Sequence, residues 1–190
     1  MSPPNYALRA AARGGGWEAL RVLHPNEIRY KAMELNAQVD LLVRNAQNNG
    51  LAPSAITTIA PVLLAVAGQL GHGEYYVLQT LEQGWVMTTL SHRNQPDSQK
   101  NVVYAYPSLK DATESQVANL DPRVMALPVP VVHILFQLLA MKPVDSLIFC
   151  ETLGQNGQRV EVRRQELESL VQSQLQETYL SGVTPPADRT

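Results

Sequence analysis

The change from a helical to a strand pattern falls within residues 71–90, GHGEYYVLQTLEQGWVMTTL. Two glycines at its start end the helical pattern that precedes them. The β-forming run Tyr75–Leu81, the turn sequence at 82–84 and a second run, Trp85–Leu90, then indicate two strands joined by a tight turn. The sequence therefore predicts an α+β fold, in which an N-terminal helical hairpin is followed by a mainly antiparallel sheet packed with helices.

Two helices are predicted before this stretch, over residues 25–73. The first runs from Pro25 to about Gln47, and its apolar residues recur at steps of four and three, which draws one stripe along the helix. The second, at 53–70, is apolar on most sides and contains Pro61, which should kink it. Because the linker is short, the two should form an antiparallel hairpin. The stripe of the first helix consists of Ile28, Ala32, Leu35, Val39, Leu42 and Ala46.

Beyond residue 90, predicted strands alternate with predicted helices. A polar loop is expected at 91–100 and a short buried strand at 123–127. Ser108 matches a helix N-cap, with Asp111 three residues further on. The other predicted elements are strands at 101–106, 145–152 and 158–162, helices at 130–141 and 164–179, and a hairpin turn at 154–157.

These elements suggest four parts of the chain. A flexible segment is expected at 1–24, the helical hairpin at 25–73, an α+β domain at 74–180 and a disordered tail at 181–190. The glycines between the helical and strand patterns mark the main boundary. We therefore expect the α+β part to fold by itself.

Three stretches of this α+β part carry a family resemblance. Residues 102–108 run from a strand into a capped helix, 127–130 place a Leu-Pro step before a buried helix, and 144–167 carry a strand, a turn and a returning strand into a helix. Over about residues 74–178 the chain resembles the N-terminal domain of the SseB family (serine-sensitivity-enhancing protein). It departs from that pattern in having the hairpin, and in having 151–154 where many such domains carry an Asn-Pro step. The resemblance implies a fold and no assigned activity.

Composition argues against several classes of protein. The net charge is −2, and no segment carries the basic stripe that phosphate binding needs, so nucleic-acid binding is not expected. The apolar stretch 55–70 is too short and too polar for a transmembrane helix. Cys150 is the only cysteine, and no signal-peptide core follows the first arginines. Both observations favour a reducing compartment, so we expect a cytoplasmic protein.

Candidate catalytic groups are few. Cys150, His133 and Asp145 are the only residues that could form a thiol triad. The apolar neighbours of Cys150 favour a small, buried and inert core residue, and those of His133 favour a hydrogen-bonded core or edge histidine. The four histidines have no paired spacing, so neither a metal site nor a cofactor is predicted. Aromatic residues on the predicted strands either pack on helices or anchor a partner: Tyr75, Tyr76, Trp85, Tyr104 and Tyr106.

The sequence favours a non-catalytic protein-binding, adaptor or assembly factor, because it lacks a chemical signature and carries a regular apolar stripe. Self-association is one form that such binding could take. Two alternatives stay open: a small-molecule sensor with a pocket between the hairpin and the sheet, and an enzyme with a dispersed site near His133 and Cys150. The candidate partner-binding residues are Ile28, Leu35, Val39, Leu42 and Trp85.

Overall fold

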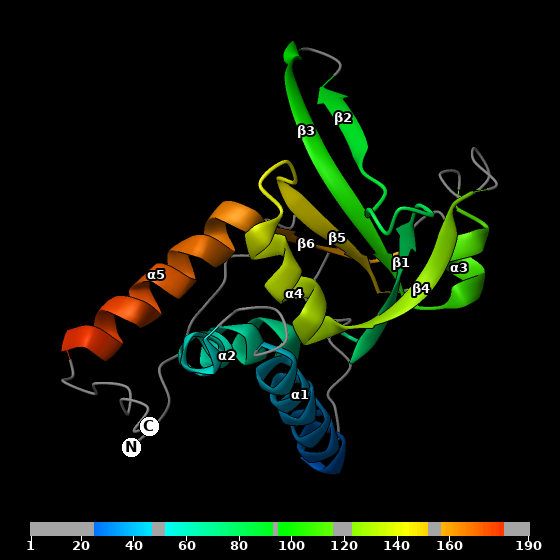
Figure 1. Cartoon of the computed structure of the whole chain (residues 1–190). Helices are drawn as coiled ribbons and strands as arrows, with labels where there is room; N and C mark the ends of the chain where they lie inside the picture. The colour runs from blue at the N-terminus through cyan, green and yellow to red at the C-terminus, as the bar shows by residue number, and fades with distance from the viewer. Residues whose placement is uncertain (1–24, 47–51, 93–94, 116–122, 152–156, 181–190) are drawn as a thin grey trace.

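Helices and one mixed sheet make up the α+β fold that the sequence predicts (Figure 1). The computed structural model describes residues 25–46, 52–92, 95–115, 123–151 and 157–180, with the backbone alone described at 25–33 and 92–98. The helices are α1 (Pro25–Ala46), α2 (Pro53–Gly68), α3 (Leu109–Thr113), α4 (Val131–Ala140) and α5 (Arg164–Leu180). The strands are β1 (Glu74–Gln79), β2 (Thr88–His92), β3 (Gln95–Tyr106), β4 (Met125–Pro130), β5 (Ser146–Cys150) and β6 (Arg159–Arg163).

The two helices predicted for the hairpin are present and pack on each other. Pro25 begins α1, where its missing N–H costs nothing, and Pro61 lies at an exposed position inside α2. The predicted cap of α3 is also confirmed, because the Ser108 hydroxyl accepts a hydrogen bond from the Asp111 N–H at 3.2 Å. Periodicity and capping therefore located these helices correctly.

The sheet has the strand order β4-β1-β3-β5-β6, and β2 pairs with the first half of β3. Every pairing is antiparallel except that of β3 with β5, so the sheet is mixed but mainly antiparallel, as predicted. The pairing of β3 with β5 starts at Val102. The part of β3 that precedes Val102 forms a hairpin with β2, and this hairpin extends away from the helices (Figure 1).

Two sequence predictions need correction. The described residues of 91–100 form strands instead of the predicted loop: β2 continues to His92, β3 begins at Gln95, and Ser91 pairs with Gln99. This end of the hairpin lies beyond the helices and needs no apolar alternation, which is why it looked like a loop. The strand predicted at 123–127 is shifted to β4 and is not buried, because β4 is an edge strand that pairs with β1 alone. The predicted turn at 154–157 lies outside the described residues except for Gly157.

Side chains of the strands point alternately to two faces of the sheet. One face packs against α1, α2, α4 and α5 and forms the core with them. Its fully buried strand residues are Tyr75, Val77, Val103, Ala105, Leu147 and Phe149. The alternate residues of the same strands form the second face, which α3 covers in part, since α3 packs on β1, β3 and β4. The second face is lined by Tyr76, Tyr104, Tyr106, Ile148, Cys150 and Arg159.

Gln38 fixes α1 to the start of α4. Its side-chain N–H donates to the Gly73 carbonyl at 2.8 Å, and its side-chain oxygen accepts the Val132 N–H at 3.0 Å. A ring nitrogen of His133 lies 3.0 Å from the Gln38 carbonyl. Gln38 is buried, so each bond satisfies a group that water cannot reach. The hydrogen-bonded role expected of His133 is thus confirmed.

A second polar contact joins the end of α2 to the end of β5. The Glu151 carboxylate accepts the Tyr75 hydroxyl at 2.7 Å and the Gly71 N–H at 2.8 Å. Burial, together with the bond to this carboxylate, raises the pKa of Tyr75, so the phenol stays a protonated donor. A Cβ at position 71 would lie 2.0 Å from the same carboxylate, so a larger residue there would displace the Glu151 carboxylate from this position.

The hairpin and the sheet share one core. Ile59, Leu63 and Val66 of α2 belong to the same buried cluster as Tyr75 and Phe149 of the sheet. The boundary near residue 73 is therefore a change of secondary structure within a common core.

Candidate functional site

The structure places most of the predicted partner-binding residues in or against the core. Leu35 is only 4% exposed, and Val39 and Leu42 pack against the core as half-buried residues. The side chain of Ile28 lies outside the described residues. The α1 stripe is thus used for packing within the chain. Trp85 is different, because it packs at the margin of the core and stays half-buried.

Trp85 belongs to an apolar surface at the β4 side of the sheet. Antiparallel pairing sets Gln79 opposite Met125 on one side and opposite Trp85 on the other, so the three side chains lie in one row on one face. Leu127 lies two residues along β4, opposite Val77 and on the same face. Met125 and Leu127 are 45% and 39% exposed. We call Trp85, Met125 and Leu127 the β4 patch.

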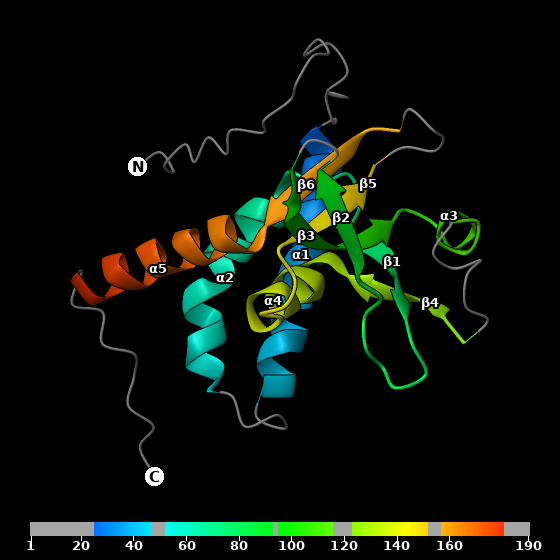
Figure 2. The same cartoon turned by 90° about the horizontal axis from the view of Figure 1, so that it is seen from above.

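The β4 patch is exposed because the helices do not extend over this part of the sheet. β4 lies on the side away from α2 and α5 (Figure 2). The direction of the chain explains why the exposure of the side chains changes along β4. Val129, next to the start of α4, packs against the core, whereas Leu127 and Met125, further from α4, are exposed.

The outer edge of β4 is poorly suited to pairing with another strand. Pro128 and Pro130 have no N–H to donate, and proline within a sheet is typical of edge strands for that reason. A partner would therefore contact the side chains of the patch rather than extend the sheet.

Hydrogen bonds in the connection between β1 and β2 hold Trp85 in place. The Thr80 N–H donates to the Gly84 carbonyl at 2.9 Å, and the Val86 N–H donates to the Leu78 carbonyl at 2.9 Å. Gln83 between them adopts a positive φ of 64°, which a tight turn requires. The tryptophan is thus presented from a short, hydrogen-bonded turn, which keeps the entropy cost of binding low.

The structure does not bring the candidate thiol triad together. His133 lies on α4, on the helix-covered side of the sheet, and contacts α1. Cys150 follows the core residue Phe149, so its side chain lies on the second face. Asp145 instead accepts the Asn101 N–H at 2.8 Å.

Cys150 is half-buried, which corrects the expectation of a fully buried thiol. It lies opposite Arg159 at the end of β5, where the second face is only partly covered. Burial raises the pKa of the Cys150 thiol, although the positive charge of Arg159 offsets part of this effect.

We expect the native protein to react slowly with a thiol reagent at neutral pH, because a raised pKa leaves little thiolate. The measurement is the rate of labelling by a chromogenic disulfide in native protein and in protein unfolded by guanidinium. Labelling should be at least about tenfold slower in the native state. Equal rates would contradict the expectation, and loss of a binding activity on labelling would place Cys150 in a functional site.

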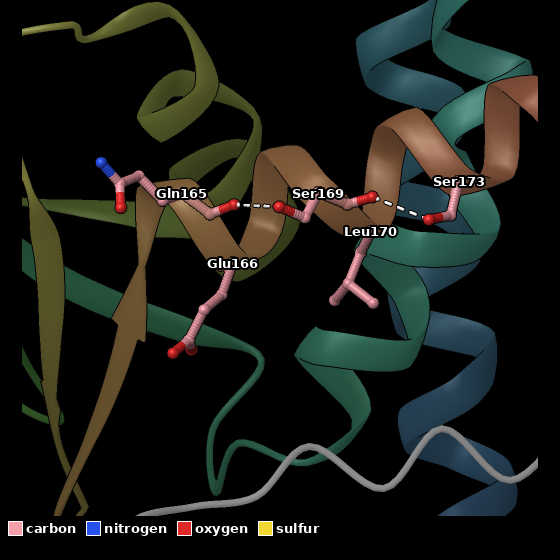
Figure 3. Close-up of a pocket in the computed structure, with 5 residues that line it drawn as sticks. All are labelled: Gln165, Glu166, Ser169, Leu170 and Ser173. Carbon is pink, nitrogen blue, oxygen red and sulfur yellow. Dashed lines mark hydrogen bonds between the residues drawn. The ribbon is translucent and has the colours of Figure 1, made fainter.

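No metal site is found within the part of the chain that the structure describes. No group of His, Cys, Asp and Glu there could hold a metal ion. An open groove runs along α5, lined by Gln165, Glu166, Ser169, Leu170 and Ser173 (Figure 3). Its serine hydroxyls donate to carbonyls of the preceding turn, so their O–H donors are already used within α5. None of the described helices is long and apolar enough to cross a membrane.

Sequence reasoning named Trp85 but missed Met125 and Leu127. The sequence shows only a short apolar run near residue 125, which is equally compatible with a buried strand. The prolines at 128 and 130 are the available signal that this strand lies at an edge.

Comparison of the chain with protein-family models, with curated proteins and with solved structures found no match.

Proposed function

We propose that the protein is a non-catalytic protein-binding module that holds a partner through the β4 patch. The observation that carries the proposal is a group of apolar side chains on one face beside the core: Met125 and Leu127 are exposed, and the half-buried Trp85 lies across Gln79 from Met125. Contiguous exposed apolar side chains on a folded protein are typical of interaction sites.

The chemistry of the patch suits this role. Tryptophan is enriched among residues that dominate binding energy, and methionine adapts its shape to a partner surface. Burying one large apolar side chain contributes about 1.5–3 kcal/mol. The turn and the core already hold Trp85 in the folded protein. Binding of a partner therefore causes little further loss of side-chain entropy at this residue.

Observations favour this role over the two alternatives. A sensor pocket between hairpin and sheet would need space where Leu63, Val66 and Phe149 form one buried cluster. A dispersed enzyme site would need His133 and Cys150 to approach each other, and they lie on opposite sides of the sheet. A binding surface requires neither an internal pocket nor a contact between His133 and Cys150.

Affinity purification from the native host with quantitative mass spectrometry tests the proposal. The Leu127→Ser/Met125→Ser variant should recover the partner at least about tenfold less well than the wild type, since two apolar contacts are lost. Leu109→Ser is the matched control, because Leu109 is 50% exposed on α3, outside the patch. Its recovery should equal that of the wild type.

Both variants should melt within about 2 °C of the wild type, because the replaced side chains are largely exposed. Equal recovery of the same proteins by the wild type and the patch variant would refute the proposal. Equal losses in the patch variant and the Leu109→Ser control would also refute it, since the effect would not be specific to the patch.

A further inference from the structure

β2 is an edge strand without the residues that usually keep two edge strands from pairing. Among the described residues it pairs with β3 alone, so one side of its backbone carries N–H and C=O groups that the sheet does not use. Its sequence, Thr-Thr-Leu-Ser-His at 88–92, contains no proline, glycine, lysine, arginine or carboxylate. A strand edge of this composition is suited to pairing with another strand.

The other described edges of the sheet are protected by proline or by charge. β4 contains two prolines, which cannot donate a backbone hydrogen bond. β6 reads Arg-Val-Glu-Val-Arg, so two copies paired about its centre would set glutamate opposite glutamate and arginine opposite arginine. The part of β3 that precedes its pairing with β5 contains a proline and two charged residues, Pro96, Asp97 and Lys100.

Two copies of β2 are complementary when they pair antiparallel about Leu90. Each Leu90 then lies opposite Leu90 of the second copy, and Thr89 lies opposite Ser91. Leu90 is 38% exposed in the single chain, so this pairing removes apolar surface from water. The Thr89 hydroxyl donates to the Asn101 side-chain oxygen at 2.9 Å and can still accept a hydrogen bond from Ser91 of the second copy. No residues of like charge lie opposite each other in this register.

The backbone of β2 is regular enough for such a pairing. The register of the hairpin shifts near its end, where Ser91 pairs with Gln99 but His92 pairs with Gln95. The unmatched residues, 96–98, therefore belong to β3, and β2 itself stays continuous. Because the hairpin extends away from the helices, a second copy can approach β2 without meeting them (Figure 1).

We propose that the protein forms a dimer in which β2 pairs antiparallel with β2 of a second copy, about a twofold axis at Leu90. Self-complementarity chooses this occupant, since one strand supplies both matching halves. The two sheets then continue as one, and each edge satisfies the unused backbone groups of the other. A twofold contact closes on itself, so association stops at the dimer. The contact is small, and we expect it to dissociate on dilution.

Sedimentation velocity of the full chain, from about 10 µM to about 1 mM, tests the proposal. The wild type should pass from monomer to dimer over this range. Leu90→Lys sets two ammonium groups opposite each other at the axis and should weaken the dimer about tenfold or more. Leu41→Lys is the matched control, because Leu41 is 43% exposed on α1. Leu127→Lys tests whether the β4 patch contributes, and both of these variants should dimerise like the wild type.

Disulfide crosslinking tests the register without adding charge. In a Cys150→Ser background, which removes the native thiol, Leu90→Cys should form a disulfide-linked dimer under a mild oxidant. Leu109→Cys in the same background is the control, because Leu109 is 50% exposed on α3. Crosslinking at position 109 should be at least about tenfold slower, since that thiol is not held against its own copy.

Several outcomes would overturn the proposal. The wild type could remain monomeric at about 1 mM, or Leu90→Lys could dimerise as well as the wild type. Equal weakening by Leu41→Lys would mean a general charge effect, and loss of the dimer in Leu127→Lys alone would move the contact to the β4 patch. If Leu90→Lys melts well below the wild type, the cysteine variants decide, and equal crosslinking at positions 90 and 109 would refute the twofold contact.

Discussion

Leu35→Asp should lower the free energy of unfolding by about 3–5 kcal/mol, whereas Leu41→Asp on the same helix should lower it by less than about 1 kcal/mol. Leu35 is 4% exposed and belongs to the core, so the substitution removes apolar burial and places a carboxylate where it has no partner. Leu41 is 43% exposed, and its replacement leaves the core intact.

Thermal melting and urea unfolding of the two variants measure this difference, and sedimentation gives their state of association. Neutralisation of the new carboxylate at low pH should recover part of the lost stability of Leu35→Asp, because the uncharged form costs less to bury. A wild-type melting temperature for Leu35→Asp would mean that the register of α1 is wrong. Loss of association without loss of stability would instead make the α1 stripe an interface.

Removal of the hairpin should prevent residues 74–180 from folding stably. The sequence pattern predicted a separable α+β part, but the shared core reverses the expected outcome. Ile59, Leu63 and Val66 of α2 belong to the same buried cluster as the sheet residues Tyr75 and Phe149. Without the hairpin this cluster would lose its α1 and α2 members, and each large side chain left exposed would cost about 1.5–3 kcal/mol.

Expression of the 74–180 fragment beside a 25–180 fragment measures the contribution of the hairpin. We expect the longer fragment to unfold cooperatively and the shorter one to aggregate or to bind a hydrophobic dye. Addition of a synthetic hairpin peptide, residues 25–73, should recover cooperative unfolding in part. A soluble 74–180 fragment with a sharp thermal transition would contradict this account and restore the predicted domain boundary.

Local patterns in the sequence predicted most of the elements. The stripe that includes Leu35 and Val39 located α1, and the Ser108 cap located α3. Inward positions of α5 such as Leu167 and Leu170 followed from helical spacing, and the structure buries the first and half-buries the second. These features depend on residues close together in the chain, so one sequence is enough to read them.

The candidate site depended on information that local patterns do not carry. Whether Met125 and Leu127 are buried or exposed depends on the strand order, which places β4 at an edge beside β1, far from it in sequence. The partner of His133 is Gln38, a residue on another helix whose position depends on the shared core. The split of the tyrosines, with Tyr75 inside and Tyr104 on the second face, likewise required the pairing register.

Photo-crosslinking from the β4 patch tests the central claim most directly. A photoreactive amino acid is placed at position 127 and, as a control, at position 109 on α3, and each full-length protein is irradiated in the native host. The account predicts a discrete crosslinked protein from position 127 that is absent from position 109 and that Trp85→Ala, in the same chain, reduces several-fold. The same products from both positions, or none from position 127, would contradict the claim that the β4 patch binds a partner.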